Sequence, residues 1–241
     1  MEQSADLKSA DQSELIRWPK FQAMLGELAE HNSFQQTHWP LIKKANEIDG
    51  FAQFQEQCPF TTKDMLAKDR INHPPYGTNL THPLNHYTRF HQTSGTLGAP
   101  MAWLDTPDDW QWMLGNWNVV LENAGVKKGK RCFFAFSFGP FLGFWTAHDA
   151  ANQRGCLCIP GGGQSSEQRL KIILEQKVEH LFCTPTYALR MAEVAKDADI
   201  DLRGNQLHSI IVAGETGGSQ YNFREKIARE WNGVKVIDHY G

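Results

Sequence analysis

The sequence has no long apolar run and no excess of either charge. No stretch approaches 18 consecutive apolar residues, so we expect no membrane-spanning helix. The start, Met1 to Glu14, is polar and acidic rather than basic and then apolar, which excludes a secretory signal there. The 24 basic and 27 acidic residues leave a net charge of −3, which disfavours nucleic acid as a partner. We therefore expect a cytoplasmic protein that binds neither a membrane nor nucleic acid.

Cysteine is scarce and odd in number. Five cysteines disfavour a disulfide framework and favour a reducing compartment. Cys156 and Cys158 form a C-x-C pair that we interpret as one face of a buried strand; the alternative, a zinc pair, lacks two further ligands at a recognisable spacing. The histidines of the central stretch are His73, His82, His86 and His91. Their spacing matches no ligand pattern, so we expect ordinary partners for them and no metal site.

One basic run surrounds Gly129. It comprises Lys127, Lys128, Lys130 and Arg131. The run joins a helical pattern to an apolar strand pattern, and charge at such a connection keeps a turn solvated. We expect a solvated turn, with an anion site as the alternative.

The composition is that of a globular protein with a real core. Of the 241 residues, 41% are hydrophobic, 11% aromatic and 21% charged, which indicates one large domain or one domain with a small appendage. Helical patterns, one of them after a possible cap at Ser13, and then a proline-rich loop region occupy the first third. We expect residues 1–85 to form a helical, loop-rich lead-in packed on a main domain, residues 86–241.

Helices and strands alternate in the main domain. Thr106, followed by Pro107 and two acidic residues, predicts a helix start, and Gly125 predicts its end. Further helices are expected at 142–153, from Ser165, at 186–195 and at 219–231, and strands at 86–91, 132–136, 156–160, 180–183, 210–213 and 234–238. This order predicts an α/β fold with a mostly parallel sheet flanked by helices on both faces. Ligands of such sheets bind at the carboxyl ends of the strands.

Glycine-bearing loops follow several of these strands. The segment 93–100, Thr-Ser-Gly-Thr-Leu-Gly-Ala-Pro, combines sharp-bending glycines with hydroxyl and N–H donors for phosphate oxygens, although it is neither a Walker A loop nor G-x-G-x-x-G. A flexible turn is the alternative. Loops at 161–163, 213–218 and 238–241 stand at three further strand ends, and together they indicate a crevice for a flat ligand.

The order of these segments resembles a known family. Residues 58–64, 93–100, 155–160, 213–215 and 238–241, in this order, are similar to motifs of the phenylacetate-coenzyme A ligases, a branch of the adenylate-forming superfamily. The resemblance runs from about residue 13 to Gly241. It implies a two-step reaction, in which a carboxylate attacks the α-phosphate of Mg·ATP and the thiol of coenzyme A then displaces AMP.

The resemblance also implies roles for particular residues. The ATP phosphates would be held by Thr93, Ser94, Gly95, Thr96, Leu97 and Gly98. The adenine pocket would be lined by Ala213, Gly214 and Glu215 and flanked by Asp238 and Tyr240. Phe138 and Phe141 would pack against the acyl group. Ala99 and Met101 stand where many relatives carry a lysine that serves the phosphates.

The family continues beyond the point where this sequence ends. The glutamate that serves magnesium, the ribose-binding aspartate and the C-terminal domain with its catalytic lysine would all follow Gly241. We therefore expect residues 86–241 to be an AMP-binding subdomain truncated at its C-terminal end, with no catalytic residue of its own. The chain alone should be inactive and should expose an apolar face that favours self-association.

The implied activity is that of an acyl-coenzyme A ligase for an aryl or arylalkyl carboxylate, with ATP, Mg²⁺ and coenzyme A. The aromatic-rich segment 133–145 favours this substrate class. Strand alternation sends Phe134, Phe136 and Phe138 to one face and Phe133 and Ala135 to the other, so most of these rings should be core. Alternatives are an adenylating enzyme that loads a carrier-protein thiol, or a non-catalytic nucleotide-binding or interaction module.

Overall fold

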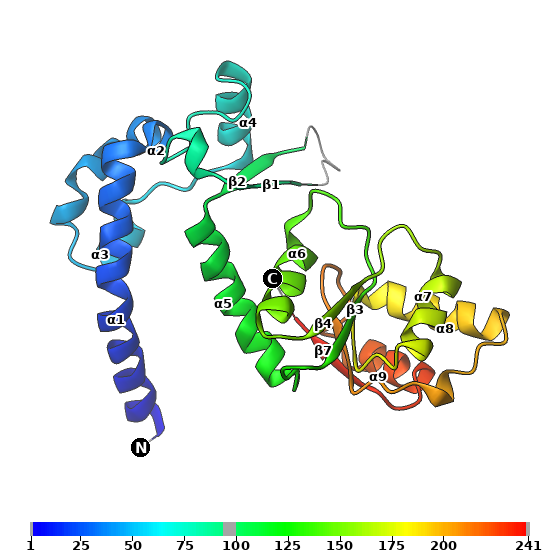
Figure 1. The fold of residues 1–241 in the computed structure, drawn as a ribbon. Helices are drawn as coiled ribbons and strands as arrows, with labels where there is room; N and C mark the ends of the chain where they lie inside the picture. The colour runs from blue at the N-terminus through cyan, green and yellow to red at the C-terminus, as the bar shows by residue number, and fades with distance from the viewer. Residues whose placement is uncertain (1, 94–99, 240–241) are drawn as a thin grey trace. The chain divides into compact units, whose positions relative to one another are not determined.

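The computed structural model describes residues 2–93 and 100–239, which fall into two compact units (Figure 1). The first unit comprises Met1–Thr88 with Met101–Leu104, and the second comprises Arg89–Pro100 with Asp105–Gly241.

The first unit is mostly helical, as expected for the lead-in. Its elements are α1 (Glu2–His31), α2 (Ser33–His38), the 3-10 helix η1 (Pro40–Glu47), α3 (Phe51–Gln57), α4 (Lys63–Asn72), the 3-10 helix η2 (Leu84–His86) and most of strand β2 (Ala102–Asp105). A core around Leu25, Trp39 and Ile42 holds α1 against η1. The expectation that α1 starts after Ser13 is wrong, because residues 2–12 contain no glycine or proline and continue the helix.

The second unit is built on a five-stranded parallel sheet. Its strands are β3 (Arg131–Phe134), β4 (Leu157–Pro160), β5 (His180–Cys183), β6 (Ser209–Val212) and β7 (Lys235–Asp238). Their order is β4-β3-β5-β6-β7, and each neighbouring pair is parallel. The expected α/β fold with a mostly parallel sheet is therefore confirmed, in a doubly wound order.

Helices cover both faces of this sheet. On one face lie α5 (Pro107–Asn123) and α6 (Leu142–Gln153), and on the other lie α7 (Ser166–Glu175), α8 (Pro185–Asp197) and α9 (Tyr221–Glu230) (Figure 1). Phe134 packs into the α5–α6 core, whereas Phe133 and Ala135 pack into the core beneath α7, α8 and α9. The predicted alternation of the aromatic segment is thus confirmed.

Local chemistry accounts for most helix and strand ends. Thr106 and Asp109 form a capping box that starts α5, and Ser165 and Gln168 form another that starts α7. Strand β3 ends before the expected residue 136, because the N–H of Phe136 turns back to bond the carbonyl of Phe134 at 3.0 Å. The strand expected at 86–91 is β1 (Arg89–Gln92), since His86 closes η2.

The cysteines and the basic run have ordinary structural places. All five cysteines are unpaired, and Cys156 and Cys158 pack in the same core as Cys132, as the strand interpretation predicted. Lys127 and Lys128 are exposed in a solvated turn. Lys130 instead pairs with Glu179, with 2.6 Å between Nζ and Oε1.

No helix in the described residues is both long and apolar enough to cross a membrane.

Candidate functional site

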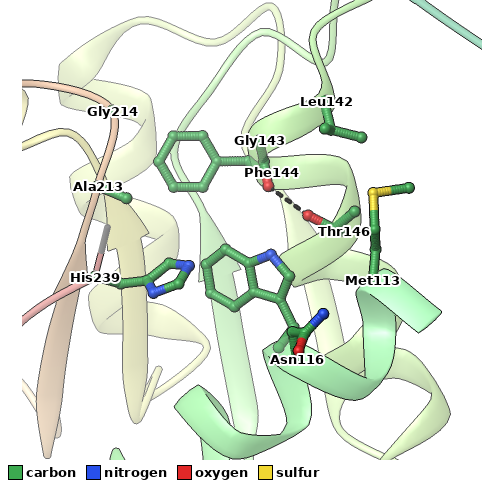
Figure 2. A pocket seen from close by; sticks show the side chains of 10 residues that line it. Met113, Asn116, Leu142, Gly143, Phe144, Thr146, Ala213, Gly214 and His239 are labelled. Atoms are coloured by element: carbon green, nitrogen blue, oxygen red, sulfur yellow. Dashed lines mark hydrogen bonds between the residues drawn. The ribbon is translucent and has the colours of Figure 1, made fainter. Parts of the chain in front are cut away.

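A cavity of about 320 Å³ opens at the carboxyl edge of the parallel sheet (Figure 2). Its walls come from α5, the first turns of α6 and the loops after β6 and β7. They consist of Met113, Asn116, Trp117, Leu142, Gly143, Phe144, Thr146, Ala213, Gly214 and His239. Figure 2 shows Ala213 and His239 on one side of the cavity, with Met113 and Leu142 opposite them. This is the edge at which parallel sheets bind their ligands.

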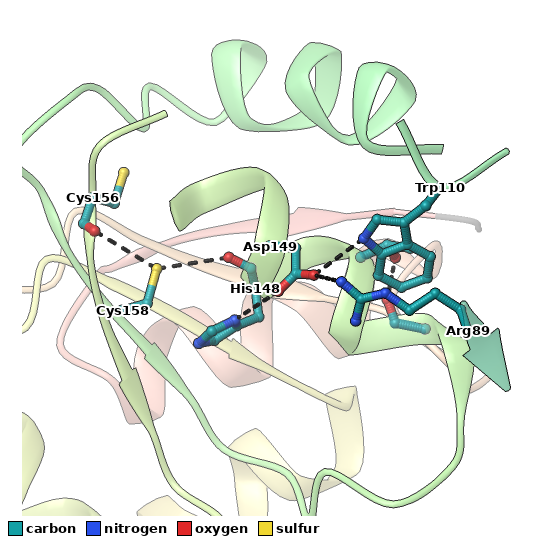
Figure 3. A network of polar contacts seen from close by, with 8 residues as sticks. Arg89, Trp110, His148, Asp149, Cys156 and Cys158 are labelled. Atoms are coloured by element: carbon teal, nitrogen blue, oxygen red, sulfur yellow. Dashed lines mark hydrogen bonds and ion pairs between the residues drawn. The ribbon is translucent and has the colours of Figure 1, made fainter. Parts of the chain in front are cut away.

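A polar network fixes the two helices that form one wall (Figure 3). Asp149 of α6 accepts from the guanidinium of Arg89 at 2.8 Å and from Nε1 of Trp110, on α5, at 3.1 Å, both on Oδ2. The Arg89 guanidinium also lies 4.3 Å from the centre of the Trp110 ring. Since the same carboxylate holds a residue of α5 and a residue of β1, the mouth between α5 and α6 is set by this contact.

The sheet topology brings the loops after β6 and β7 together. The N–H of His239 donates to the carbonyl of Val212 at 2.9 Å, which continues the β6–β7 pairing past the last strand residue. A Cβ on Gly218 would collide with the carboxylate of Asp238, so the Asp238 side chain packs directly on the backbone of Gly218. Gly214 adopts a φ of +87°, a left-handed conformation that favours glycine. The predicted segment 213–218 and the residues Asp238 and His239 therefore meet at one place.

His239 is the titratable side chain on the cavity wall. Its ring meets the Trp117 indole edge to face, with 4.4 Å between centroids. Burial lowers the pKa of the imidazole below its ordinary value, although the neighbouring Asp238 carboxylate acts in the opposite direction. The ring is therefore uncharged near neutral pH.

The residues predicted to bind nucleotide are only partly gathered at the cavity. Ala213 and Gly214 line it, whereas Glu215 turns toward α8 and accepts from Oγ1 of Thr186 at 2.5 Å and from its N–H at 3.3 Å. Asp238 lies beside Gly218 and does not line the cavity. Thr93 is the last described residue before the gap, and Ser94, Gly95, Thr96, Leu97, Gly98 and Tyr240 lie outside the described residues.

The two phenylalanines predicted to contact the acyl group do not line the cavity. Phe138 has a φ of +51°, unusual for a bulky residue, and its ring packs on Phe136 at 4.4 Å and on Trp145 at 4.7 Å. Phe136 in turn stacks on Phe144, a lining residue, at 4.4 Å. Phe138 is thus one layer behind the wall. Phe141, just before α6, has 48% of its surface exposed.

The glycine loop at 161–163 is not part of the cavity. The N–H of Gly161 donates to the carbonyl of Phe134 at 2.8 Å, and a Cβ on Gly161 would clash with the Phe133 ring. Arg169 donates from Nε to the carbonyl of Gly161 at 2.8 Å. This loop therefore packs α7 and β4 against β3. The other two glycine-bearing loops contribute Ala213, Gly214 and His239 to the cavity wall.

Several lining residues were missed by the sequence interpretation. Met113 and Trp117 lie four residues apart, a spacing typical of the buried face of a helix; Trp117 is indeed buried, but both residues also line the cavity. His239 was noted within its segment without a role. Its position directly after a strand was the available signal, because strand ends of parallel sheets face the ligand.

No metal centre is evident in the described part of the chain. No three of its histidine, cysteine, aspartate and glutamate side chains converge closely enough to hold an ion. His91 is bonded to Asp105, with 3.1 Å between Nδ1 and Oδ2, and its ring stacks on Trp110. The rings of His82 and His86 stack on each other at 5.9 Å.

Sequence comparison connects the chain to one group of enzymes. It is 30% identical to the phenylacetate-coenzyme A ligase of Pseudomonas putida over 187 residues, which are 76% of this chain and 40% of that protein. The enzyme of Thermus thermophilus is 27% identical over 185 residues, with 77% and 40% covered. No family model matches the chain. The resemblance stated from the motifs is confirmed, and the chain spans about two fifths of the length of these curated relatives.

Comparison with solved structures confirms the fold. A 2-hydroxyisobutyryl-CoA ligase in an open conformation superposes with a TM-score of 0.84 at 23% identity, covering 91% of this chain and 48% of the ligase. In its thioesterification state the same ligase gives a TM-score of 0.88 at 24% identity, covering 95% and 49%. Both ligase structures hold 2-HIB-AMP and coenzyme A. At 23% and 24% identity, this structural similarity shows that the two proteins share a fold.

Proposed function

From the similarity to the phenylacetate-coenzyme A ligases, we propose that this chain supplies the acyl-binding and nucleotide-binding part of an AMP-forming acyl-coenzyme A ligase. The acid would be an aryl or arylalkyl carboxylate. Its carboxylate would attack the α-phosphate of ATP and release pyrophosphate, and the thiol of coenzyme A would then displace AMP from the acyl-adenylate. The five unpaired cysteines favour a reducing compartment, and we place the protein in the cytoplasm.

The observation that carries the proposal is an apolar cavity placed against two of the predicted nucleotide segments. Ala213 and Gly214 belong both to the segment expected at adenine and to the cavity wall, so an acyl group in the cavity would continue directly into a nucleotide at the sheet edge. Trp117 and Phe144 give the cavity flat aromatic walls, on which a ring can pack. A volume near 320 Å³ is at the lower end of the range of sites that bind small molecules.

The proposal assigns roles around this cavity. Residues 93–98 would bind the phosphates, and Ala213, Gly214, Glu215, Asp238 and Tyr240 would surround the base. Phe141 lies outside the cavity but directly precedes the lining residue Leu142, and its role toward the acyl group rests on the resemblance to the family. Phe138 would act on it through Phe136 and Phe144, by holding the aromatic wall in place.

We propose that Mg²⁺ binds together with ATP and has no separate site in the described residues. The described residues do not form a site of their own for it, because no three acidic, histidine or cysteine side chains converge and the Glu215 carboxylate is bonded to Thr186. Mg²⁺ is often held mainly by substrate phosphates and water, with one or two carboxylates. We therefore assign no described residue to it.

The proposal is tested by binding of a stable acyl-adenylate mimic. Phenylacetyl sulfamoyl adenosine should bind the purified chain in calorimetric titration, and Ala213→Leu should weaken it about tenfold or more by filling the cavity. Ala198→Leu places the same side chain at the exposed end of α8 and should leave the affinity unchanged. Equal affinity in the wild type and Ala213→Leu, or preference for a decanoyl mimic, would contradict the proposed site.

A further inference from the structure

The imidazole of His239 stands on the cavity wall without a hydrogen-bond partner in the part of the chain that the structure describes. His239 is held in place through its backbone bond to Val212 and through the contact of its ring with Trp117. Within the described residues, neither nitrogen of its ring makes a hydrogen bond. A neutral imidazole offers one donor and one acceptor, so both are open to whatever occupies the cavity.

Two of the other polar side chains on the wall, Thr146 and Asn116, each make a hydrogen bond within their own helix. The hydroxyl of Thr146 donates to the carbonyl of Gly143 at 2.7 Å. Nδ2 of Asn116 donates to the carbonyl of Trp112 at 3.2 Å, on the exposed side of α5. The remaining side chains that face the ring across the cavity, such as Met113 and Leu142, are apolar (Figure 2). Among the lining side chains that the structure describes, His239 is therefore the one that offers both a donor and an acceptor at ring nitrogens without a hydrogen bond, while Trp117 offers only the donor Nε1–H.

An occupant without polar groups would use this site poorly. Such an occupant would displace water from the imidazole nitrogens without forming hydrogen bonds to them. Leaving these polar atoms without a hydrogen bond costs binding free energy. Sites that contain such a group discriminate strongly between ligands that satisfy it and analogues that do not.

We propose that His239 selects aryl or arylalkyl acids whose ring carries a neutral hydrogen-bonding substituent, above all a hydroxyl, by pairing with that substituent inside the cavity. This inference rests on the proposed function and specifies its substrate class. A phenolic hydroxyl can donate to the bare nitrogen or accept from the N–H, so either tautomer of the imidazole serves. A second carboxylate is disfavoured, because a partly buried, uncharged imidazole offers it no ion pair.

The test compares matched acyl-adenylate mimics on the purified chain. Phenylacetyl sulfamoyl adenosine and its 2-, 3- and 4-hydroxyphenylacetyl counterparts differ only in the hydroxyl. We expect at least one hydroxylated mimic to bind about tenfold more tightly than the parent in calorimetric titration. His239→Leu should abolish that preference, so that this variant binds the parent and the hydroxylated mimics with affinities that agree within about threefold, and His239→Gln, which keeps a donor and an acceptor, should retain part of it.

His208→Leu is the matched control, because His208 is exposed and precedes β6 at the opposite end of the strands. This variant should keep the full preference for the hydroxylated mimic. If the parent mimic binds but no hydroxylated isomer binds more tightly, or if His239→Leu keeps the preference, the inference is overturned and the proposed function stands. If no aryl mimic binds to the folded chain, both are overturned.

Discussion

His180 is a histidine held uncharged inside the sheet. It is fully buried on β5, and its Nδ1 lies 2.8 Å from the hydroxyl of Ser209, while Nε2 has no partner in the described residues. Burial lowers the pKa of His180 to about 4; His208 and Lys130 add to the shift, and Glu179 opposes it. The residue lies at the amino ends of the strands, opposite the cavity, so its titration concerns stability rather than binding.

This burial predicts an acid-sensitive fold. The unfolded chain takes up the His180 proton near pH 6.5 and the folded chain only near pH 4, so the unfolded state binds more protons between these values. The free energy of unfolding should therefore fall by about 2–3 kcal/mol as the pH drops from 7 to 4.5. Urea unfolding at both pH values measures this.

Two substitutions separate His180 from the other acid-sensitive groups. His180→Gln should remove most of the predicted loss on acidification, whereas His208→Gln should keep most of it, since burial is the largest cause of the shift. An unchanged loss in His180→Gln would show that other groups govern the acid response.

At the scale of elements, the position of α5 against α6 depends on one carboxylate. Asp149 bonds both Arg89 and Trp110, and its side chain is largely covered. Asp149→Asn should lower the free energy of unfolding by about 2 kcal/mol, because it leaves the Arg89 guanidinium without its counter-charge. It should also weaken binding of the aryl mimic, since α5 and α6 form one wall of the cavity.

The control is a carboxylate of similar chemistry in an exposed pair. Glu193 contacts Arg190 on the surface of α8, where both side chains are well solvated. Glu193→Gln should change the free energy of unfolding by less than about 0.5 kcal/mol. Chemical unfolding followed by circular dichroism measures both variants, and equal losses would contradict the structural role of Asp149.

Elements with local signals were predictable from the sequence, and those without were not. The bounds of α6 and β5 agree with expectation, and the two capping boxes located the starts of α5 and α7, because these signals depend only on neighbouring residues. The start of α1 was missed because polar helix formers precede Ser13 without any break. Strand β3 ends two residues early through a turn bond that periodicity does not reveal.

The full lining of the cavity could not be predicted from the sequence, because it depends on how distant segments pack together. The sequence located Ala213 and Gly214 at a strand end, because topology alone puts such residues at the ligand edge. An apolar residue of α5 is either buried in the core or faces the cavity, depending on how closely α6 approaches α5. That approach depends on the contact between Asp149 and Arg89, which lie 60 residues apart in the sequence. Phe138 has a left-handed backbone and its ring packs on Trp145, seven residues further along the chain, which strand periodicity does not predict.

At the scale of the second unit, an apolar strip remains on the surface of α5. Trp112 is 73% exposed and Val119 is 61% exposed, and a spacing of seven residues puts both on the same side of the helix. The strand β7 lies at one end of the sheet order. Exposed large apolar side chains that share a face favour association with another apolar surface.

We therefore expect the purified chain to self-associate at tens of micromolar. Burying a tryptophan and a valine in each of two copies removes enough apolar surface to contribute several kcal/mol, at roughly 25 cal/mol per Å². The double variant Trp112→Ser with Val119→Ser should then sediment as a monomer. Tyr221→Ser removes an equally exposed aromatic ring from α9, away from this strip, and should associate like the wild type. Sedimentation velocity over a tenfold concentration range distinguishes the cases, and a monodisperse wild-type monomer throughout would show that the strip on α5 does not drive association.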